Sequence, residues 1–296
     1  MKILVTGATG FIGQALLRKL PPEVTEVRVL SRDPERTKLG AFVWDAENEV
    51  APATALGGID VVIHLAGENV GAGRWSDETK RRILASRERG TRNLVEGLNR
   101  LPRPPVLIST SAVGFYGNSG DALLTEDRPA GQGFLAHVCE VWEAEARKAN
   151  VARLVIPRLG VVLGPGGGAI AKLLPVFKSG LGGRIGDGEQ WMSWIHLDDV
   201  VAFLLRAIRD EEMKGIYNLV APTPVKNAAF AETLGHVLHR PSLLPVPAVA
   251  LKLALGEMAE ETLLASQRVS AAKLLREDFT FAWPELEGAL RQITAP

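Results

Sequence analysis

Short apolar runs alternate with amphipathic segments through the first half of the chain. The runs with the length and content of buried strands lie at Lys2–Val5, Glu26–Leu30, Ala41–Trp44, Asp60–Leu65, Val106–Ser109 and Ala152–Ile156. Apolar residues recur at helical spacing between them, over residues 11–20, 77–101 and 135–149. This alternation predicts an α/β fold with a doubly wound parallel sheet.

The second half of the chain begins with glycine-rich loops at residues 164–168 and 180–188. Helical and strand patterns follow at Asp198–Arg209, Ile216–Leu219, Asn227–His239, Ala248–Glu257 and Leu286–Ile293. We expect a nucleotide-binding domain at 1–164, to which residues 196–220 return. Residues 165–195 and 221–296 are expected to form a smaller C-terminal substrate lobe.

A strand, three spaced glycines and a helix start follow one another at the N-terminus. Gly7 allows a tight turn after the strand, Gly10 lets the backbone approach a pyrophosphate, and Gly13 lets the helix pack closely on the strand. The helix that begins with Phe11 and Ile12 directs free N–H groups and its positive dipole end at the anion. This context predicts a Rossmann domain that binds a dinucleotide, and the alternative is a purely structural turn.

The tip of the second strand indicates which dinucleotide is bound. An NAD site usually places Asp or Glu there to bind the ribose 2′-hydroxyl. Here the strand ends in Ser31 and Arg32, which offer a hydroxyl and a planar cation to a 2′-phosphate. We therefore expect NADP rather than NAD, with a solvated turn as the alternative.

Small residues follow the fourth strand at Leu65, Ala66 and Gly67, where a cofactor lying across the strand ends needs room. Arg87 lies on the apolar stripe of the next helix, where an unpaired charge is costly. Its partner is expected to be either a structural carboxylate or the phosphate and ribose region of the cofactor.

Four segments resemble the extended short-chain dehydrogenase/reductases, and the similarity covers nearly the whole chain. Residues 6–13 are similar to the cofactor turn of that family, 111–117 to its active-site segment after strand five, 158–165 to its strand-six motif, and 194–199 to a later segment. Residues 66–69, 74–75, 86–87, 188–194 and 256–259 resemble its atypical epimerase-like subgroup. The resemblance implies a nicotinamide cofactor and hydride transfer.

The chain departs from this family at the catalytic pair. The family uses a Tyr-x-x-x-Lys pair on the helix after strand five, in which Lys lowers the pKa of the proton-donating Tyr. Here one register of that helix pairs Phe134 with Val138, and the next pairs Leu135 with Cys139. The usual acid/base machinery is therefore not expected.

Tyr116 is the strongest remaining candidate for the proton donor, because it follows strand five on the ligand side. Ser111 accompanies it, although it lies one residue further from the tyrosine than the helper serine of the family. The alternative for Tyr116 is a substrate contact or a packed aromatic residue.

The composition of the chain excludes several classes of binding partner. Lys+Arg and Asp+Glu both number 34 in 296 residues, and no long basic tract is visible, which argues against nucleic acid. No stretch of about 18 apolar residues predicts a membrane span, and no clustered His/Cys spacing predicts a metal site. The single cysteine, Cys139, fits a reducing compartment, so we expect a cytoplasmic protein. A monomer and a homodimer both remain open.

Together these patterns predict an NADP(H)-binding oxidoreductase or epimerase-like enzyme that acts on a small polar substrate. The competing hypothesis is a catalytically silent protein that binds NADP(H) to sense redox state or to dock a partner. The missing Tyr/Lys pair favours the second hypothesis, and the Gly/Trp-rich segment at 180–194 favours the first.

Overall fold

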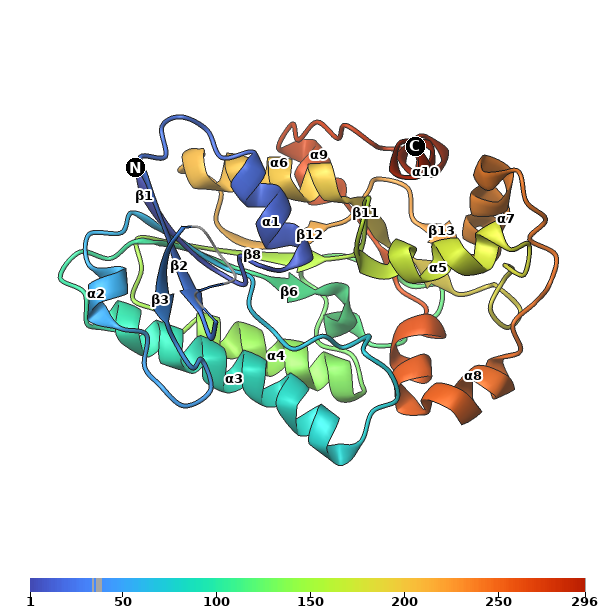
Figure 1. Ribbon diagram of the computed structural model, residues 1–296, viewed down its shortest axis with the longest axis horizontal. Coiled ribbons are helices and arrows are strands. Elements are labelled where there is room, and N and C mark those ends of the chain that lie inside the picture. Colours follow the sequence, from blue (N-terminus) through green and yellow to red (C-terminus); the bar gives the residue numbers. More distant parts are fainter. Residues whose placement is uncertain (34, 36–38, 296) are drawn as a thin grey trace.

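The computed structural model describes residues 1–33, 35 and 39–295, and it is built around one large parallel sheet (Figure 1). The sheet has the order β12-β8-β5-β4-β1-β2-β3, and β6 pairs with β8 off this path. Its strands are β1 (Lys2–Thr6), β2 (Glu26–Ser31), β3 (Gly40–Val43), β4 (Val61–His64), β5 (Val106–Ser109), β6 (Ser111–Ala112), β8 (Arg153–Leu159) and β12 (Gly215–Leu219).

The strand order changes direction at β1, which has β2 on one side and β4 on the other. The register pairs Thr6 with His64, so the carboxyl ends of β1 and β4 finish side by side. Ligands of doubly wound sheets bind at such a switch point. The predicted doubly wound parallel sheet is confirmed.

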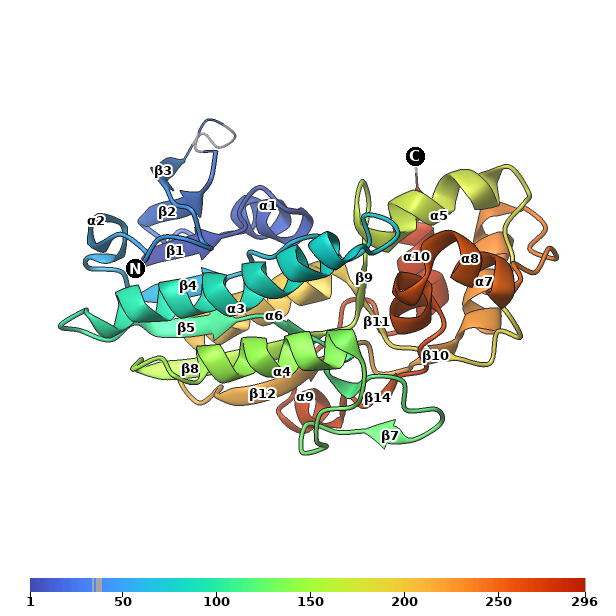
Figure 2. The same ribbon diagram turned by 90° about the horizontal axis from the view of Figure 1, so that it is seen from below.

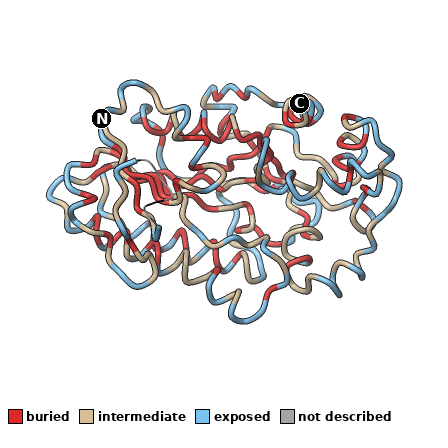
Figure 3. The backbone as a smooth tube through the Cα atoms, viewed as in Figure 1, coloured by how far each residue is buried: buried red, intermediate tan, exposed pale blue. Residues whose placement is uncertain are grey.

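Helices cover both faces of the sheet (Figures 1 and 2). One face carries α1 (Phe11–Arg18) and α6 (Leu197–Arg209), and the other carries α3 (Asp77–Asn99) and α4 (Phe134–Ala146). In β1, Ile3 and Val5 join the core on the first side, whereas Leu4 joins the core on the second side. Because both faces are buried, the strands read as continuous apolar runs, and they form the buried centre in Figure 3.

A smaller lobe at the carboxyl edge of the sheet has its own core around Trp194, Phe230 and Leu290. Its helices are α5 (Gly168–Lys178), α7 (Asn227–Leu238), α8 (Ala248–Leu255) and α10 (Leu286–Thr294). Three short strand pairs connect segments that are distant in sequence: β9 (Val161–Leu163) with β11 (Trp194–His196), β10 (Trp191–Met192) with β13 (Val225–Lys226), and β7 (Leu123–Leu124) with β14 (Arg268–Val269).

The lobe also contacts the ends of α3 and α4 through a small apolar cluster. Met258 of the lobe packs with Trp75, Ile83 and Val138, and Leu255 lies against this cluster. Further short elements are α2 (Ala53–Leu56), η2 (Val113–Tyr116), η3 (Ala259–Leu263) and α9 (Ala272–Arg276). The boundaries of the two domains predicted above stay a prediction.

The sequence patterns located every strand of the main sheet except β6, but they missed α5 and the short paired strands. The α5 helix begins inside the glycine-rich segment, contains Pro175 and has no side-chain cap at its start. Local signals therefore favour a loop there. Burial of Ile170 and Phe177 against the C-terminal lobe overrides them.

Candidate functional site

The turn between β1 and α1 is closely packed, and it requires two of its glycines. Gly7 has φ +69°, and a Cβ atom there would lie 2.7 Å from the carbonyl carbon of Leu65. A Cβ atom on Gly13 would lie 2.4 Å from the carbonyl oxygen of Gly7. The backbone of this turn can therefore approach both α1 and the end of β4 only because side chains are absent.

The first turn of α1 keeps its N–H groups available. Gly10 is the N-cap residue and supplies no side-chain cap, and the first turn holds no acidic residue. Phe11 packs against the glycine loop before α5, where a Cβ atom on Gly167 would lie 2.4 Å from the Phe11 ring. Ile12 packs on the main core. These features fit an anion at the helix start, as a dinucleotide pyrophosphate requires.

At the tip of β2, the Ser31 hydroxyl takes part in a local turn. It donates to the carbonyl oxygen of Asp33 at 2.9 Å and accepts the N–H of Asp33 at 3.1 Å. The side chain of Arg32 is exposed beside it. Hydrogen bonds from Asn48 and Glu47 lower the pKa of the Asp45 carboxyl, and Arg32 also lies near enough to lower it.

A buried polar chain holds the segment after β4. The Thr6 hydroxyl accepts the N–H groups of Leu65 and Ala66, each at 3.2 Å, and lies 2.7 Å from Nδ1 of His64. Nε2 of His64 lies 3.1 Å from the Thr91 hydroxyl. The Thr6 oxygen already accepts two backbone N–H groups, so its own O–H donates to Nδ1 of His64. Nε2 of His64 therefore carries the ring hydrogen and donates it to the Thr91 hydroxyl. Burial, reinforced by nearby Arg87, lowers the pKa of His64 to about 4.

Arg87 braces the same segment from α3. Its Nη1 donates to the carbonyl oxygens of Glu68 at 3.0 Å and Ile83 at 3.2 Å. A Cβ atom on Gly67 would lie 3.1 Å from the Arg87 guanidinium carbon, which explains why the smallest residue is found there. The guanidinium carbon also lies 5.0 Å from the Trp142 ring centre. Within the described part of the chain, Arg87 forms no ion pair with a carboxylate, so the structural carboxylate considered above is not found.

The structure places Tyr116 in the core, with 1% of its surface exposed. Its hydroxyl lies 2.6 Å from Oδ1 of Asn218 and 3.1 Å from the carbonyl oxygen of Thr125, and it accepts Nη1 of Arg158 at 2.8 Å. Burial raises the pKa of Tyr116, and Arg158 partly opposes this. This placement favours the packed-aromatic alternative for Tyr116.

Ser111 belongs to the same buried network. Its hydroxyl donates to Oε1 of Glu143 at 2.8 Å, and Arg158 pairs with both oxygens of that carboxylate at 2.8 and 3.0 Å. The guanidinium carbon of Arg158 lies 3.5 Å from the Phe115 ring centre. The two predicted catalytic hydroxyls, on Ser111 and Tyr116, are thus brought together through the side chains of Glu143 and Arg158.

The two possible registers of the missing Tyr/Lys pair have different surroundings. Phe134 packs edge-on against Trp75 at 5.3 Å between ring centres, in the apolar cluster that also holds Met258. In the other register, a Cβ atom on Gly114 would lie 3.4 Å from the Cβ of Leu135 and 3.8 Å from the Sγ of Cys139. The second register therefore faces the segment after β5. Burial raises the pKa of the Cys139 thiol to about 11, which makes it a poor proton donor at neutral pH.

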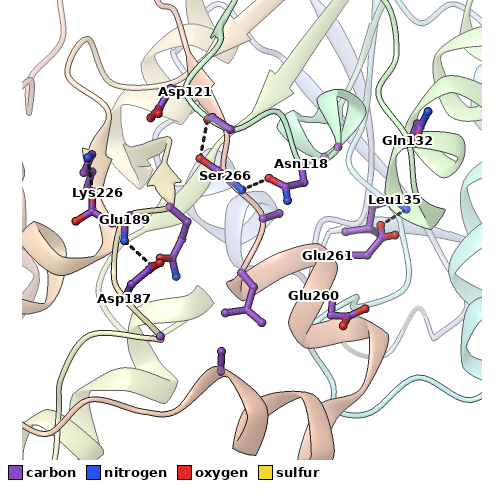
Figure 4. A pocket seen from close by; sticks show the side chains of 18 of the residues that line it. Asn118, Asp121, Gln132, Leu135, Asp187, Glu189, Lys226, Glu260, Glu261 and Ser266 are labelled. Carbon is purple, nitrogen blue, oxygen red and sulfur yellow. Dashed lines mark hydrogen bonds and ion pairs between the residues drawn. The ribbon is translucent and has the colours of Figure 1, made fainter.

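A cavity of about 770 Å³ opens where the two lobes meet (Figure 4). Its volume is within the range of small-molecule sites. Gly114, Gly117 and Leu135 line it on the sheet side, and η3 and the loop at 186–190 line it on the other. The cavity is thus lined both by the segment after β5 and by Leu135, one of the two positions at which the family would carry its catalytic tyrosine.

Glu261 of η3 lies in the wall of this cavity, directly beside the start of α4. Its two carboxylate oxygens accept the N–H groups of Phe134 and Leu135, each at 2.8 Å. Figure 4 shows the contact with Leu135. The N-cap residue of α4, Gly133, has no side chain, and a Cβ atom there would lie 2.4 Å from Oε1 of Glu261. Sequence reasoning missed Glu261, because nothing local connects residues 127 positions apart.

In the described ranges, no group of three or more His, Cys, Asp or Glu side chains is arranged to hold a metal ion. Over the same residues, no helix has the length and apolar content needed to cross a bilayer.

Known proteins similar to this chain share its whole length. A model described as the NAD dependent epimerase/dehydratase family matches residues 3–219, and one for a domain of unknown function matches residues 246–293. The chain is 40% identical to an Arabidopsis thaliana protein named "Epimerase family protein SDR39U1 homolog, chloroplastic", over 99% of this chain and 86% of that protein.

Two solved structures are similar over 99% of this chain. That of "human epimerase family protein SDR39U1 (isoform2) with NADPH" is 35% identical with a TM-score of 0.89, and 99% of it is covered. That of "the nucleoside-diphosphate sugar epimerase from Corynebacterium glutamicum" is also 35% identical, with a TM-score of 0.79 and 58% of that chain covered.

Proposed function

The chain belongs to the NAD-dependent epimerase/dehydratase family, and we propose that it is an NADP(H)-dependent oxidoreductase or epimerase-like enzyme for a small polar substrate. Membership confirms the resemblance seen in the sequence. The observation that carries the proposal is the cavity at Leu135 and Gly114, which adjoins the segment that holds the proton donors in the parent family. A protein that only sensed NADP(H) would not need this second site.

The residues around the switch point fit a dinucleotide. Gly7 and Gly13 leave room for close backbone approach, and the open start of α1 at Gly10, Phe11 and Ile12 fits the pyrophosphate. Leu65, Ala66 and Gly67 lie at the end of β4, the edge of the sheet where the cofactor is expected. When bound, the nicotinamide would supply or accept a hydride.

We propose NADP rather than NAD because Arg32 lies exposed at the tip of β2. Ser31 would assist it with a hydroxyl. The human relative that is described with NADPH supports the same choice. Arg87, fixed by two carbonyl oxygens, would act by holding the Gly67 segment under the cofactor, with its remaining N–H donors available to the ribose or phosphate.

Hydride transfer to a carbonyl also needs a proton donor within hydrogen-bond reach. Tyr116 and Ser111 were proposed from the sequence, but their hydroxyls are engaged inside the core. Glu261 instead lies in the cavity wall, 2.8 Å from the backbone nitrogen of Leu135 at the vacant register. Because Glu261 is an acceptor towards α4, we propose that it accepts the proton when an alcohol is oxidised, and that a water beside it donates the proton when a carbonyl is reduced.

We propose a protein that works as a monomer or homodimer, without nucleic acid or membrane as a partner. The cytoplasm is the proposed compartment, although the Arabidopsis relative is named chloroplastic.

The test is a fluorescence titration with NADPH and NADH, wild type beside Arg32→Ala. Arg103→Ala is the matched control, because Arg103 is exposed and pairs with Asp60 at the amino edge of the sheet. We expect Arg32→Ala to weaken NADPH binding about tenfold or more while NADH binding changes little. Equal binding of NADPH and NADH that Arg32→Ala leaves unchanged would contradict the NADP assignment.

The second stage is a screen for NADPH oxidation with aldehydes, ketones and keto-sugars. Turnover of any carbonyl supports the enzyme. Tight NADPH binding without turnover across the screen would favour the silent sensor instead.

A further inference from the structure

The cavity between the lobes has an unusual balance of charge for a site in a nucleotide-binding fold. Five carboxylates line it but only two cations, and the described lining residues include no arginine or histidine. The charged residues are Asp121, Asp187, Glu189, Glu260, Glu261, Lys226 and Lys252.

Both lysines of the cavity are already paired. Nζ of Lys226 lies 2.5 Å from Oε2 of Glu189, and Nζ of Lys252 lies 2.9 Å from Oε1 of Glu260. Each pair is about neutral as a whole. A phosphate that entered the cavity would compete with Glu189 or Glu260 for a lysine whose charge is already matched.

The other three carboxylates form no ion pair among the described residues, although Lys226, which already pairs with Glu189, also interacts electrostatically with Asp121 and Asp187. Asp121 accepts the indole N–H of Trp191 at 2.6 Å, Asp187 accepts the backbone N–H of Glu189 at 3.0 Å, and Glu261 accepts the two α4 amides. Figure 4 shows that they lie around the same space. One lysine thus serves three carboxylates, and the lining keeps a net negative charge that a cationic ligand would neutralise.

We infer that this cavity selects a cationic polar substrate, an amine-bearing alcohol or carbonyl compound, and excludes nucleoside diphosphate sugars. The inference rests on the proposed function, which makes the cavity the substrate site. Like charges in a partly enclosed site raise the energy of a diphosphate, and the same field attracts an amine. Asn118 and Gln132, which also line the cavity, provide amides for hydroxyl groups.

The experiment compares four probes against the NADPH-loaded protein by saturation-transfer NMR. Glucosamine is cationic, glucose is neutral, glucuronate is anionic, and UDP-glucose carries the diphosphate. We expect glucosamine to bind about tenfold or more tightly than glucuronate, glucose to lie between them, and UDP-glucose not to compete with glucosamine. Added salt should reduce the difference, because it screens exposed charge.

The variants are Asp121→Asn, Asp187→Asn and the double substitution, which keep the size of each side chain and remove its charge. The double variant should lose most of the preference for glucosamine while NADPH affinity stays unchanged. Asp77→Asn is the matched control, since Asp77 is an exposed carboxylate on α3 outside the cavity.

Three outcomes would overturn the inference: glucuronate or UDP-glucose binding as tightly as glucosamine, no detectable glucosamine binding, or a preference that the double variant retains. NADPH affinity is measured on the same samples. If the wild-type protein does not bind NADPH, the proposed function is refuted. If it binds NADPH but prefers glucuronate or UDP-glucose to glucosamine, only the proposed substrate class is refuted.

Discussion

Arg158 and Glu143 form an ion pair through two contacts, with both side chains closed off from solvent. Such pairs are costly to desolvate, and removing one partner leaves an uncompensated charge in the core. The pair also holds the hydroxyls of Ser111 and Tyr116. It therefore joins α4 and β8 to the segment after β5, which borders the cavity.

We expect Arg158→Met to lower the free energy of unfolding by about 3–5 kcal/mol, because Glu143 then keeps only the half-exposed Arg147 as a cation. Urea denaturation measures this. Arg291→Met, which breaks an exposed pair with Glu287 on α10, is the control and should cost less than about 1 kcal/mol. Similar losses in the two variants would contradict the role given to burial.

Tyr116→Phe distinguishes a structural role of the Tyr116 hydroxyl from a role as proton donor. The change removes the hydroxyl partner of Asn218 and Arg158 in the core, so we expect a loss of about 1–3 kcal/mol in stability. Hydride transfer with a carbonyl found in the screen should persist. Tyr217→Phe is the matched control at the only other tyrosine. Loss of kcat in Tyr116→Phe with unchanged stability would instead support Tyr116 as the proton donor.

The buried imidazole of His64 predicts a loss of stability in acid. In the unfolded chain His64 takes up a proton near its ordinary pKa of 6.5, whereas in the folded protein its pKa is about 4. As the pH falls through this window, the unfolded state binds more protons and stability decreases, by roughly 3 kcal/mol in total.

We expect His64→Asn to be less stable than the wild type near neutral pH, but to lose less stability between about pH 7 and about pH 4. Denaturation curves across this range test it. His137→Asn, at an exposed position on α4, should follow the wild-type pH dependence. Parallel pH curves for His64→Asn and the wild type would show that His64 does not titrate as expected.

Gly13→Ala tests the glycine turn. The new Cβ would meet two fixed backbone groups, the Gly7 oxygen at 2.4 Å and the Ala8 Cα at 2.7 Å. We expect α1 to shift away from β1 and NADPH affinity to fall at least about tenfold. Gly288→Ala on α10 meets nothing closer than 4.0 Å, so it should leave NADPH binding intact.

Glu261→Gln tests the contact between the lobes. A glutamine has only one acceptor oxygen, so one α4 amide loses its partner, and we expect a stability loss of about 1 kcal/mol. Glu260→Gln, the neighbouring surface position, should cost less. If Glu261 exchanges the proton, Glu261→Gln also lowers kcat while NADPH affinity is retained; full activity would dismiss that assignment.

Local signals predicted the parts of the site that are contiguous in the chain. Gly7, Gly10 and Gly13 follow a strand and open a helix, so their arrangement can be read from spacing alone. On the helix after β5, the sequence left two registers open, Phe134 with Val138 and Leu135 with Cys139. Only the packing of the second pair against Gly114 distinguishes them.

The interactions that could not be predicted are those that depend on tertiary folding. Tyr116 follows a strand on the ligand side, as expected, but its direction is set by Asn218, 102 residues away. Burial against such distant partners carries no local pattern, so the sequence could not distinguish a catalytic tyrosine from a packed one.

The bond from Glu261 to α4 also has a meaning for synthesis on the ribosome. The first turn of α4 is synthesised 127 residues before Glu261, which accepts its N–H groups. At ordinary rates of translation this delay lasts roughly 6 to 25 s. During that time the nascent chain holds the nucleotide-binding half without the wall of its cavity. The order of synthesis therefore completes the wall of the cavity only after the nucleotide-binding half has left the ribosome.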